Sequence, residues 1–210
     1  MELLGSLFSR NRAWAAAHVG SDPDFFSRLC DIHRPELLWI GCSDSRVPAN
    51  EIVGLAPGEL FVHRNVANVF PPHDPNATAV LDFAVRSLGV RHVIVCGHYR
   101  CGGVRAALQG NLDGAVGTWL RPVHDVAERH ADDLPSGETF EVRWNRLCEL
   151  NVAAQVRSVT ATDIVRAAWE RGAPLAVHGW IYDLRDGLLR DLGLTTDGES
   201  PPRGLARAAT

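Results

Sequence analysis

Two short stretches, far apart in the sequence, carry residues that bind metal ions. Each begins with an apolar run that meets a glycine, and each then presents side chains with donor atoms. The four candidate ligands are Cys42, Asp44, His98 and Cys101. Two thiolates, an imidazole and a carboxylate suit tetrahedral zinc, whereas magnesium and calcium prefer oxygen ligands. The pattern therefore predicts a zinc site formed where two strands end.

The spacing within each stretch supports this prediction. Cys42 and Asp44 are two residues apart, so they face the same side of an extended segment. His98 and Cys101 are three apart, which suits a loop running into the first turn of a helix. A single Cys or His at a strand end is more often a buried core residue. Only the two clusters together make the metal prediction specific, and open parallel sheets bind ligands at such strand ends.

Arg46 lies two residues after Asp44 and could hold its carboxylate through two parallel hydrogen bonds. With all four protein ligands bound, zinc has a closed shell that leaves no position for water. We therefore predict that Asp44 switches between zinc and Arg46, and that its release opens a position for a water molecule that zinc activates. The alternative is that Arg46 is an ordinary ion-pair partner.

Four short motifs contain or accompany these residues along the chain. They are Cys-Ser-Asp-Ser-Arg at 42–46, Phe-Val-His-Arg-Asn-Val-Ala-Asn at 61–68, Gly-His-Tyr-Arg-Cys-Gly-Gly at 97–103 and His-Gly-Trp-Ile-Tyr at 178–182. Together they resemble the β-class carbonic anhydrases over most of the chain. The resemblance implies a zinc enzyme that hydrates carbon dioxide reversibly to bicarbonate and a proton. Because thiolates donate charge to the metal, water bound to this zinc should be less acidic than water on zinc held by three neutral imidazoles. Activity should therefore rise toward alkaline pH.

Further residues are candidates for the site. Gly102 could offer its backbone N–H to the substrate. Val62, Val66 and Phe83 are candidates for the apolar pocket that a neutral gas needs, with Phe83 a candidate to come from a neighbouring subunit. Plain core packing explains these three side chains equally well.

Three more residues match the bicarbonate site of one bacterial subgroup of this family. They are Trp39, Arg64 and Tyr182, whose indole, guanidinium and phenol groups are all hydrogen-bond donors and so suit an anion. In that subgroup, bicarbonate favours the closed form with the aspartate on zinc. The resemblance implies the same allosteric switch here, inactive at lower pH and active at alkaline pH. The alternative is that the two aromatic residues only fill the core.

Composition narrows the other possibilities. The chain has 210 residues, 46% of them hydrophobic, and a formal net charge of -4 without a basic run, so we expect no nucleic-acid partner. The start does not resemble a signal peptide, and no run approaches the ~18 apolar residues that span a bilayer, so we expect no membrane association. Five cysteines, two of them predicted ligands, fit a reducing cytoplasm.

Hydrophobic patterning predicts an α/β protein with a central, mostly parallel sheet flanked by helices. We expect a two-helix arm at 1–35, a single domain at 36–197 and a loose tail at 198–210. The predicted strands are 37–40, 60–63, 91–96, 175–182 and 188–194, and the predicted helices of the domain are 77–88, 101–108, 116–130, 139–159 and 162–172. Asn76 is expected to cap the first of these helices, and Pro23 to begin the second helix of the arm.

The resemblance also implies a homodimer or homotetramer, with the arm crossing to a second subunit. Two rival functions remain open. The same scaffold could hydrolyse carbon disulfide or carbonyl sulfide, as relatives of this family do. A non-catalytic protein could instead hold a purely structural zinc and bind bicarbonate through Arg64, although Arg46 beside Asp44 argues against a permanent four-ligand site.

Overall fold

The computed structural model describes residues 2–31 and 34–199. The chain forms two compact units, 1–34 and 35–210. Most of the tail expected at 198–210 lies outside the described residues. Among the helices of the described ranges, none combines the length and apolar character needed to cross a bilayer.

The first unit is a pair of helices, α1 (Glu2–Ser21) and α2 (Phe25–Asp31). The expectation that Pro23 begins the second helix is wrong, because Asp22 and Pro23 lie in the connecting turn. There the Asp22 carboxylate accepts the Asp24 N–H at 3.3 Å and α2 begins one residue later. Trp14 packs edge-on against Phe26, with ring centroids 5.6 Å apart, so aromatic contacts hold the two helices together.

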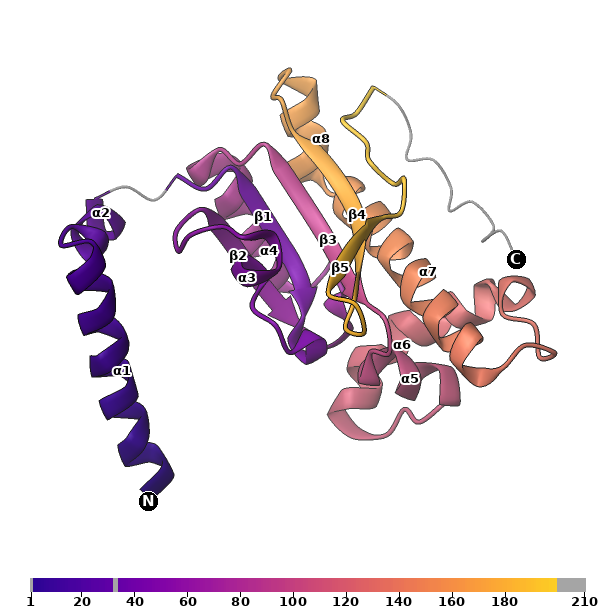
Figure 1. Cartoon of the computed structure of the whole chain (residues 1–210). Coiled ribbons are helices and arrows are strands. Elements are labelled where there is room, and N and C mark those ends of the chain that lie inside the picture. The colour runs from indigo at the N-terminus through magenta and orange to yellow at the C-terminus, as the bar shows by residue number, and fades with distance from the viewer. Residues whose placement is uncertain (1, 32–33, 200–210) are drawn as a thin grey trace. The chain divides into compact units, whose positions relative to one another are not determined.

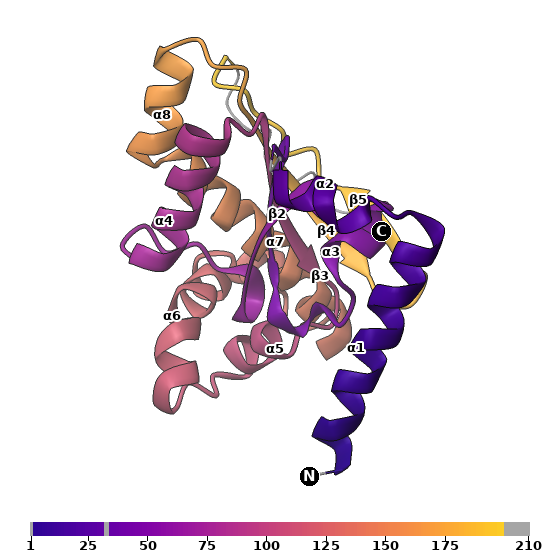
Figure 2. The same cartoon turned by 90° about the vertical axis from the view of Figure 1, so that its left-hand side faces the viewer.

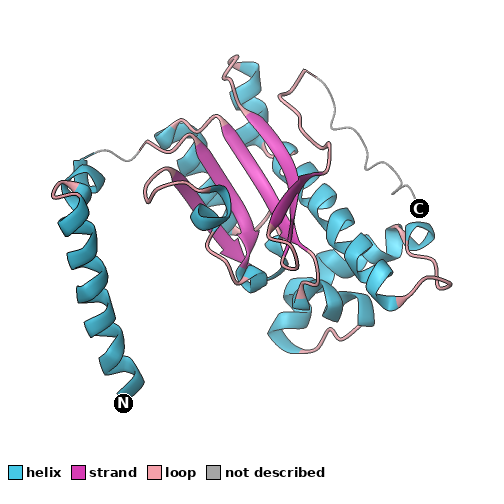
Figure 3. Ribbon diagram, viewed as in Figure 1, coloured by secondary structure: helices cyan, strands magenta, loops and turns pink. Residues whose placement is uncertain are grey.

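The second unit is built around a five-stranded sheet, drawn as magenta arrows in Figure 3. The strand order is β2-β1-β3-β4-β5. Their bounds are β1 Leu37–Cys42, β2 Leu60–Asn65, β3 His92–His98, β4 Ala176–Asp183 and β5 Leu188–Asp191. The first four pair in parallel, and β5 runs antiparallel to β4 (Figure 1). The predicted fold class is confirmed.

Helices cover the two faces of this sheet unequally. The longer helices α4, α7 and α8 lie on one side of it, and the short helix α3 lies on the other (Figure 2). The helices α5 and α6 pack against each other and against α7 near the carboxyl end of β3. Their bounds are α3 Ala49–Val53, α4 Pro75–Asp82, α5 Gly102–Gln109, α6 Gly114–Arg129, α7 Phe140–Thr160 and α8 Asp163–Glu170, with short helical turns at Ser43–Ser45, Val66–Asn68, Phe83–Leu88 and Ala131–Asp133.

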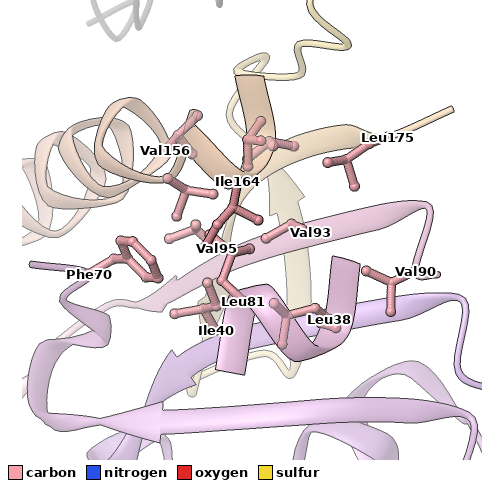
Figure 4. Packing of buried hydrophobic residues seen from close by; sticks show 14 of the residues in the cluster. Leu38, Ile40, Phe70, Leu81, Val90, Val93, Val95, Val156, Ile164 and Leu175 are labelled. Atoms are coloured by element: carbon pink, nitrogen blue, oxygen red, sulfur yellow. The ribbon is translucent and has the colours of Figure 1, made fainter. Parts of the chain in front are cut away.

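The main core lies between the sheet and the longer helices. Strands β1 and β3 are apolar almost throughout because parallel strands are buried on both faces. In Figure 4, Leu38 and Ile40 of β1 face Leu81 of α4, and all three side chains are buried. Gly97 allows α7 to approach β3 closely, since a Cβ there would lie 2.6 Å from Val152 Cγ2. This packing fixes the strand end that carries His98.

The predicted helix at 77–88 ends at Leu88 as expected, but the observed helix differs in its start and in the form of its last turns. It begins at Pro75, and Asp74 rather than Asn76 is the cap, because the Asp74 carboxylate accepts the Asn76 N–H at 3.0 Å. Proline at the first helical position needs no N–H partner, which favours this earlier start. From Phe83 to Leu88 the helix widens to the π form and ends at Gly89 in the left-handed conformation.

Candidate metal centre

Three of the four predicted donors meet at one point of the sheet. Cys42 is the last residue of β1, His98 is the last residue of β3, and Cys101 immediately precedes α5. Their ligand atoms all lie within 4.8 Å of one another, and all three residues are buried. From β1 the chain continues to β2 on one side, while β3 lies on the other, so the strand order reverses between β1 and β3. The cluster therefore occupies the position where open α/β sheets bind ligands.

The geometry of this cluster fits zinc. The Sγ atoms of Cys42 and Cys101 are 3.6 Å apart, close to the ~3.8 Å between two thiolates on a tetrahedral zinc with bonds of about 2.3 Å. The Nδ1 atom of His98 lies 3.0 Å from the Tyr99 carbonyl oxygen, which can only accept, so Nδ1 carries the proton. The other ring nitrogen, Nε2, is buried without a hydrogen-bond partner among the described residues. It is therefore a free lone pair facing two thiols, as a metal ligand must be.

The contact between the two thiols shifts their pKa values in opposite directions. The hydrogen bond with Cys101 lowers the pKa of Cys42 to about 4, against the opposing effect of burial. The same contact, together with burial, raises the pKa of Cys101. The pair therefore loses one proton easily and holds the other. Because metal ligands must be deprotonated, a bound cation would displace this second proton.

Asp44 stands outside the three-donor cluster. Its carboxylate accepts the Gly102 N–H at 2.8 Å through Oδ2 and faces Arg46 Nη2 at 3.3 Å through Oδ1. The turn Ser43–Ser45 and the left-handed backbone of Arg46, with φ of 63°, aim both side chains at each other. In this arrangement the Gly102 N–H, expected to serve the substrate, is bonded to Asp44. The structure thus contains the Asp44–Arg46 pair, and a tetrahedral zinc held by the three donors would have a fourth position for a water molecule.

Arg64 lies beside the same turn and makes four contacts to it. The acceptors are the carbonyl oxygens of Cys42 (3.0 Å), Ser43 (3.4 Å) and Val47 (3.4 Å) and the Ser45 hydroxyl (2.6 Å). The guanidinium therefore braces the loop that carries Cys42 and Asp44.

The two aromatic residues predicted with Arg64 belong to the small cluster under α3. Trp39 is 3% exposed and Tyr182 is 7% exposed. Glycine at position 41 makes room for the indole, since a Cβ there would lie 2.6 Å from Trp39 Nε1 and 3.9 Å from Arg64 Cγ. Trp39 and Arg64 are thus neighbours, while Tyr182 pairs with His98 across β3 and β4.

The three candidate pocket residues lie on the β2 side of the metal centre. Val66 contacts the first turn of α5, because a Cβ on Gly103 would lie 2.9 Å from Val66 Cγ1. Phe83 packs against Phe61, with ring centroids 5.8 Å apart. Val62, Val66 and Phe83 are 39%, 38% and 50% exposed, so none of them is a core residue of the chain.

Sequence reasoning missed one contact to the metal centre. The Ala67 N–H donates to Cys42 Sγ at 3.1 Å, in addition to the Asp44 N–H at 3.3 Å. The signal was present in α7, where Asn151 and Gln155 interrupt an apolar face at helical spacing and are almost fully buried. Buried amides need hydrogen-bond partners, and these two find theirs in the segment around Ala67.

A doubly wound sheet with a Cys–His–Cys centre at its switch point defines a zinc protein of the α/β class. The family model described as carbonic anhydrase matches residues 37–189. A carbonic anhydrase from Emericella nidulans is 50% identical over 192 residues, which cover 91% of this chain and 84% of that protein. The solved β-carbonic anhydrase from Coccomyxa, in complex with acetazolamide, is 40% identical with a TM-score of 0.88, covering 93% of this chain and 88% of that one.

A second solved structure agrees. A tetrameric β-carbonic anhydrase from Sordaria macrospora also has 40% identity and a TM-score of 0.88, over 93% of this chain and 100% of that chain. This chain belongs to the β-carbonic anhydrase family, whose members use zinc.

Proposed function

We propose that this protein catalyses the reversible hydration of carbon dioxide to bicarbonate and a proton, with zinc held by Cys42, His98 and Cys101. The observation that carries the proposal is the buried three-donor cluster, with Asp44 held beside it by Gly102 and Arg46. When bound, zinc supplies a Lewis acid that lowers the pKa of water and makes it a nucleophile near neutral pH. The protein supplies the donor geometry, the orientation of Asp44 and exclusion of bulk water.

Asp44 performs the positioning step. With Oδ2 on the Gly102 N–H and Oδ1 near Arg46, the carboxylate is held beside the three-donor cluster. It can accept a hydrogen bond from the attacking water and so orient the water lone pair toward carbon dioxide. Release from Arg46 would let Asp44 reach the cluster as a fourth ligand and close the site. Asp44 thus switches the enzyme between an active and an inactive form.

Bicarbonate regulates this switch through Arg64, with Trp39 and Tyr182 completing the anion site. The support is the position of Arg64, whose guanidinium bonds the carbonyl oxygens of Cys42 and Ser43 and the Ser45 hydroxyl. An anion bound to Arg64 would compete with these acceptors, because a guanidinium has only five N–H donors. Loss of the contacts would free the loop that holds Asp44 against Arg46. Bicarbonate bound here therefore favours the closed form.

Removal of Arg64 tests the regulation. An Arg64→Ala variant should bind regulatory bicarbonate ~10- to 100-fold more weakly, since hydrogen bonds to charged groups contribute about 1.5–3 kcal/mol. Tyr182→Phe leaves the loop contacts intact and should weaken the effect by about 2- to 10-fold. The measurement is stopped-flow hydration at several bicarbonate concentrations near neutral pH. Regulation through this site is refuted by two folded variants that both keep the bicarbonate inhibition and pH profile of the wild type.

The rival substrates are separated by direct comparison. Zinc-loaded protein is assayed in parallel for hydration of carbon dioxide and for release of hydrogen sulfide from carbonyl sulfide and carbon disulfide. Hydration should be the fastest reaction by far. If release of hydrogen sulfide dominates, the protein is a carbonyl sulfide or carbon disulfide hydrolase. If the zinc-containing protein is inert toward all three substrates, the zinc is structural.

The active protein is a homo-oligomer, a dimer or a tetramer. The exposed Val62, Val66 and Phe83 support this proposal, since a site for a neutral gas should not have its apolar wall in water. The Sordaria macrospora relative is described as tetrameric. Analytical ultracentrifugation of the full chain at micromolar concentration should show a dimer or larger species, and a stable, fully active monomer would refute the proposal.

We propose that the protein works in the cytoplasm, a reducing compartment. All five cysteines are free, and the site needs two of them as thiolates. Cell fractionation locates the protein, and recovery from an oxidising compartment would contradict this.

A further inference from the structure

The segment from Val66 to Phe70 contains a left-handed turn that its alanine, Ala67, does not favour. Ala67 has φ of 65° and Asn68 has φ of 47°, both in the left-handed region where glycine is the usual residue. Such conformations persist only where the surroundings impose them, and they cluster at functional sites. Here the conformation turns the Ala67 N–H toward Cys42 Sγ, at 3.1 Å.

Four side chains from outside this turn, or at its edge, hold its backbone. Each accepts from or donates to a different part of it, at distances of 2.7–2.8 Å. Trp119 Nε1 donates to the Val66 carbonyl, Asn151 Nδ2 donates to the Ala67 carbonyl, the Asn65 amide bonds both backbone groups of Val69, and Gln155 Oε1 accepts the Phe70 N–H.

Two of these side chains come from the interior of α7. Asn151 and Gln155 are 1% and 3% exposed, and Gln155 Nε2 donates to Asn151 Oδ1 at 2.9 Å. Their neighbours on this helix are apolar core residues such as Leu147 and Val152. A leucine at either position would avoid the desolvation of an amide, so packing alone does not account for the pair. What the pair gains is a fixed backbone at Ala67.

We propose that Asn151 and Gln155 are positioning residues for the metal centre, acting through the Ala67 N–H on the Cys42 sulfur. The inference rests on the proposed zinc function. A hydrogen bond to a thiolate withdraws electron density from the sulfur, so the thiolate donates less charge to a bound metal. Loss of the clamp would let the turn relax, lengthen the bond from Ala67, and leave Cys42 both less well oriented and more strongly donating.

The test replaces Asn151 with leucine, which keeps the size of the side chain and removes its hydrogen bonds. Full-length protein loaded with cobalt shows the effect as the thiolate-to-cobalt charge-transfer absorption, which should move to longer wavelength in Asn151→Leu. The same variant should lose zinc to a chelator at a concentration ~10- to 100-fold lower than the wild type, the usual effect of removing an outer partner of a metal ligand. Neither readout requires turnover.

Asn145→Leu is the matched control, because Asn145 lies on the same helix and its Oδ1 is buried without a hydrogen-bond partner among the described residues. It should match the wild type in both readouts. Gln155→Met is a second, milder variant and should shift both readouts in the same direction by less. Wild-type absorption and zinc retention in folded Asn151→Leu, or in folded Gln155→Met where the leucine variant does not fold, overturn the proposal. A wild-type protein without any charge-transfer absorption would instead refute the metal centre.

Discussion

Replacement of Cys101 by alanine is expected to weaken zinc binding by roughly 10²- to 10⁴-fold and to abolish hydration at ordinary zinc concentrations. The apparent free energy of binding a structural zinc is about 10–16 kcal/mol, and removal of one of three protein ligands forfeits about a third of it. In the observed geometry, the cluster contains no fourth His, Cys, Asp or Glu among the described residues. Metal analysis after dialysis against a chelator measures the effect.

Cys96→Ala is the matched control for this experiment. Cys96 lies on β3 and is buried, as Cys101 is. Its thiol donates to the Gly97 carbonyl at 3.3 Å and is not part of the cluster. The control protein should retain one zinc per chain. A Cys101→Ala protein that retains zinc as well as this control would show that the cluster is not the metal site.

Asp44→Asn is expected to keep zinc and to lower kcat/KM by about 10²-fold, the effect of losing a group that positions the reacting atoms. Zinc should remain because the carboxylate lies outside the three-donor cluster. Activity should fall because an amide carries no charge for Arg46 to hold and has only one oxygen to accept from Gly102 and the attacking water. Stopped-flow hydration and metal analysis on one preparation give both numbers.

The exposed pair of Asp82 and Arg86 provides the control for the charge change. Its oxygen and nitrogen lie 3.1 Å apart, and its side chains are about as exposed as those of Asp44 and Arg46. Asp82→Asn should therefore have wild-type activity, since an exposed ion pair contributes little to stability. Equal activity of the two variants would remove Asp44 from the mechanism.

Sequence reasoning anticipated the sheet and the placement of the donors because both depend on local patterns. Apolar runs define β1 and β3, and parallel pairing brings their ends together, so Cys42 and His98 had to lie close. The structure extends both strands by two residues, which places these ligands on the strands themselves. The prediction that Asn76 caps α4 is wrong because Asp74 and Asn76 are both good caps, and Pro75 between them favours Asp74.

Other features depend on contacts that no local pattern reveals. The left-handed turn at Ala67 is held in part by a hydrogen bond from Asn151, a residue 84 positions later. An alanine predicts no such turn, since its intrinsic preference is against it. The contact of Arg64 is also long-range. Its guanidinium donates to the carbonyl of Cys42, 22 residues earlier, and no local pattern around Arg64 predicts this. Local sequence patterns do not reveal long-range hydrogen bonds of this kind, so the site predicted from the sequence lacks them.

We propose that the protein hydrates carbon dioxide with zinc held by Cys42, His98 and Cys101. The most direct measurement is stopped-flow hydration on one preparation as purified, after zinc removal by a chelator, and after zinc is restored, across about pH 6.5 to 9. We predict that activity disappears with the metal, returns with one zinc per chain, and rises with pH. Hydration that survives complete zinc removal, or that stays absent after zinc is restored to folded protein, would contradict zinc-dependent catalysis at this site.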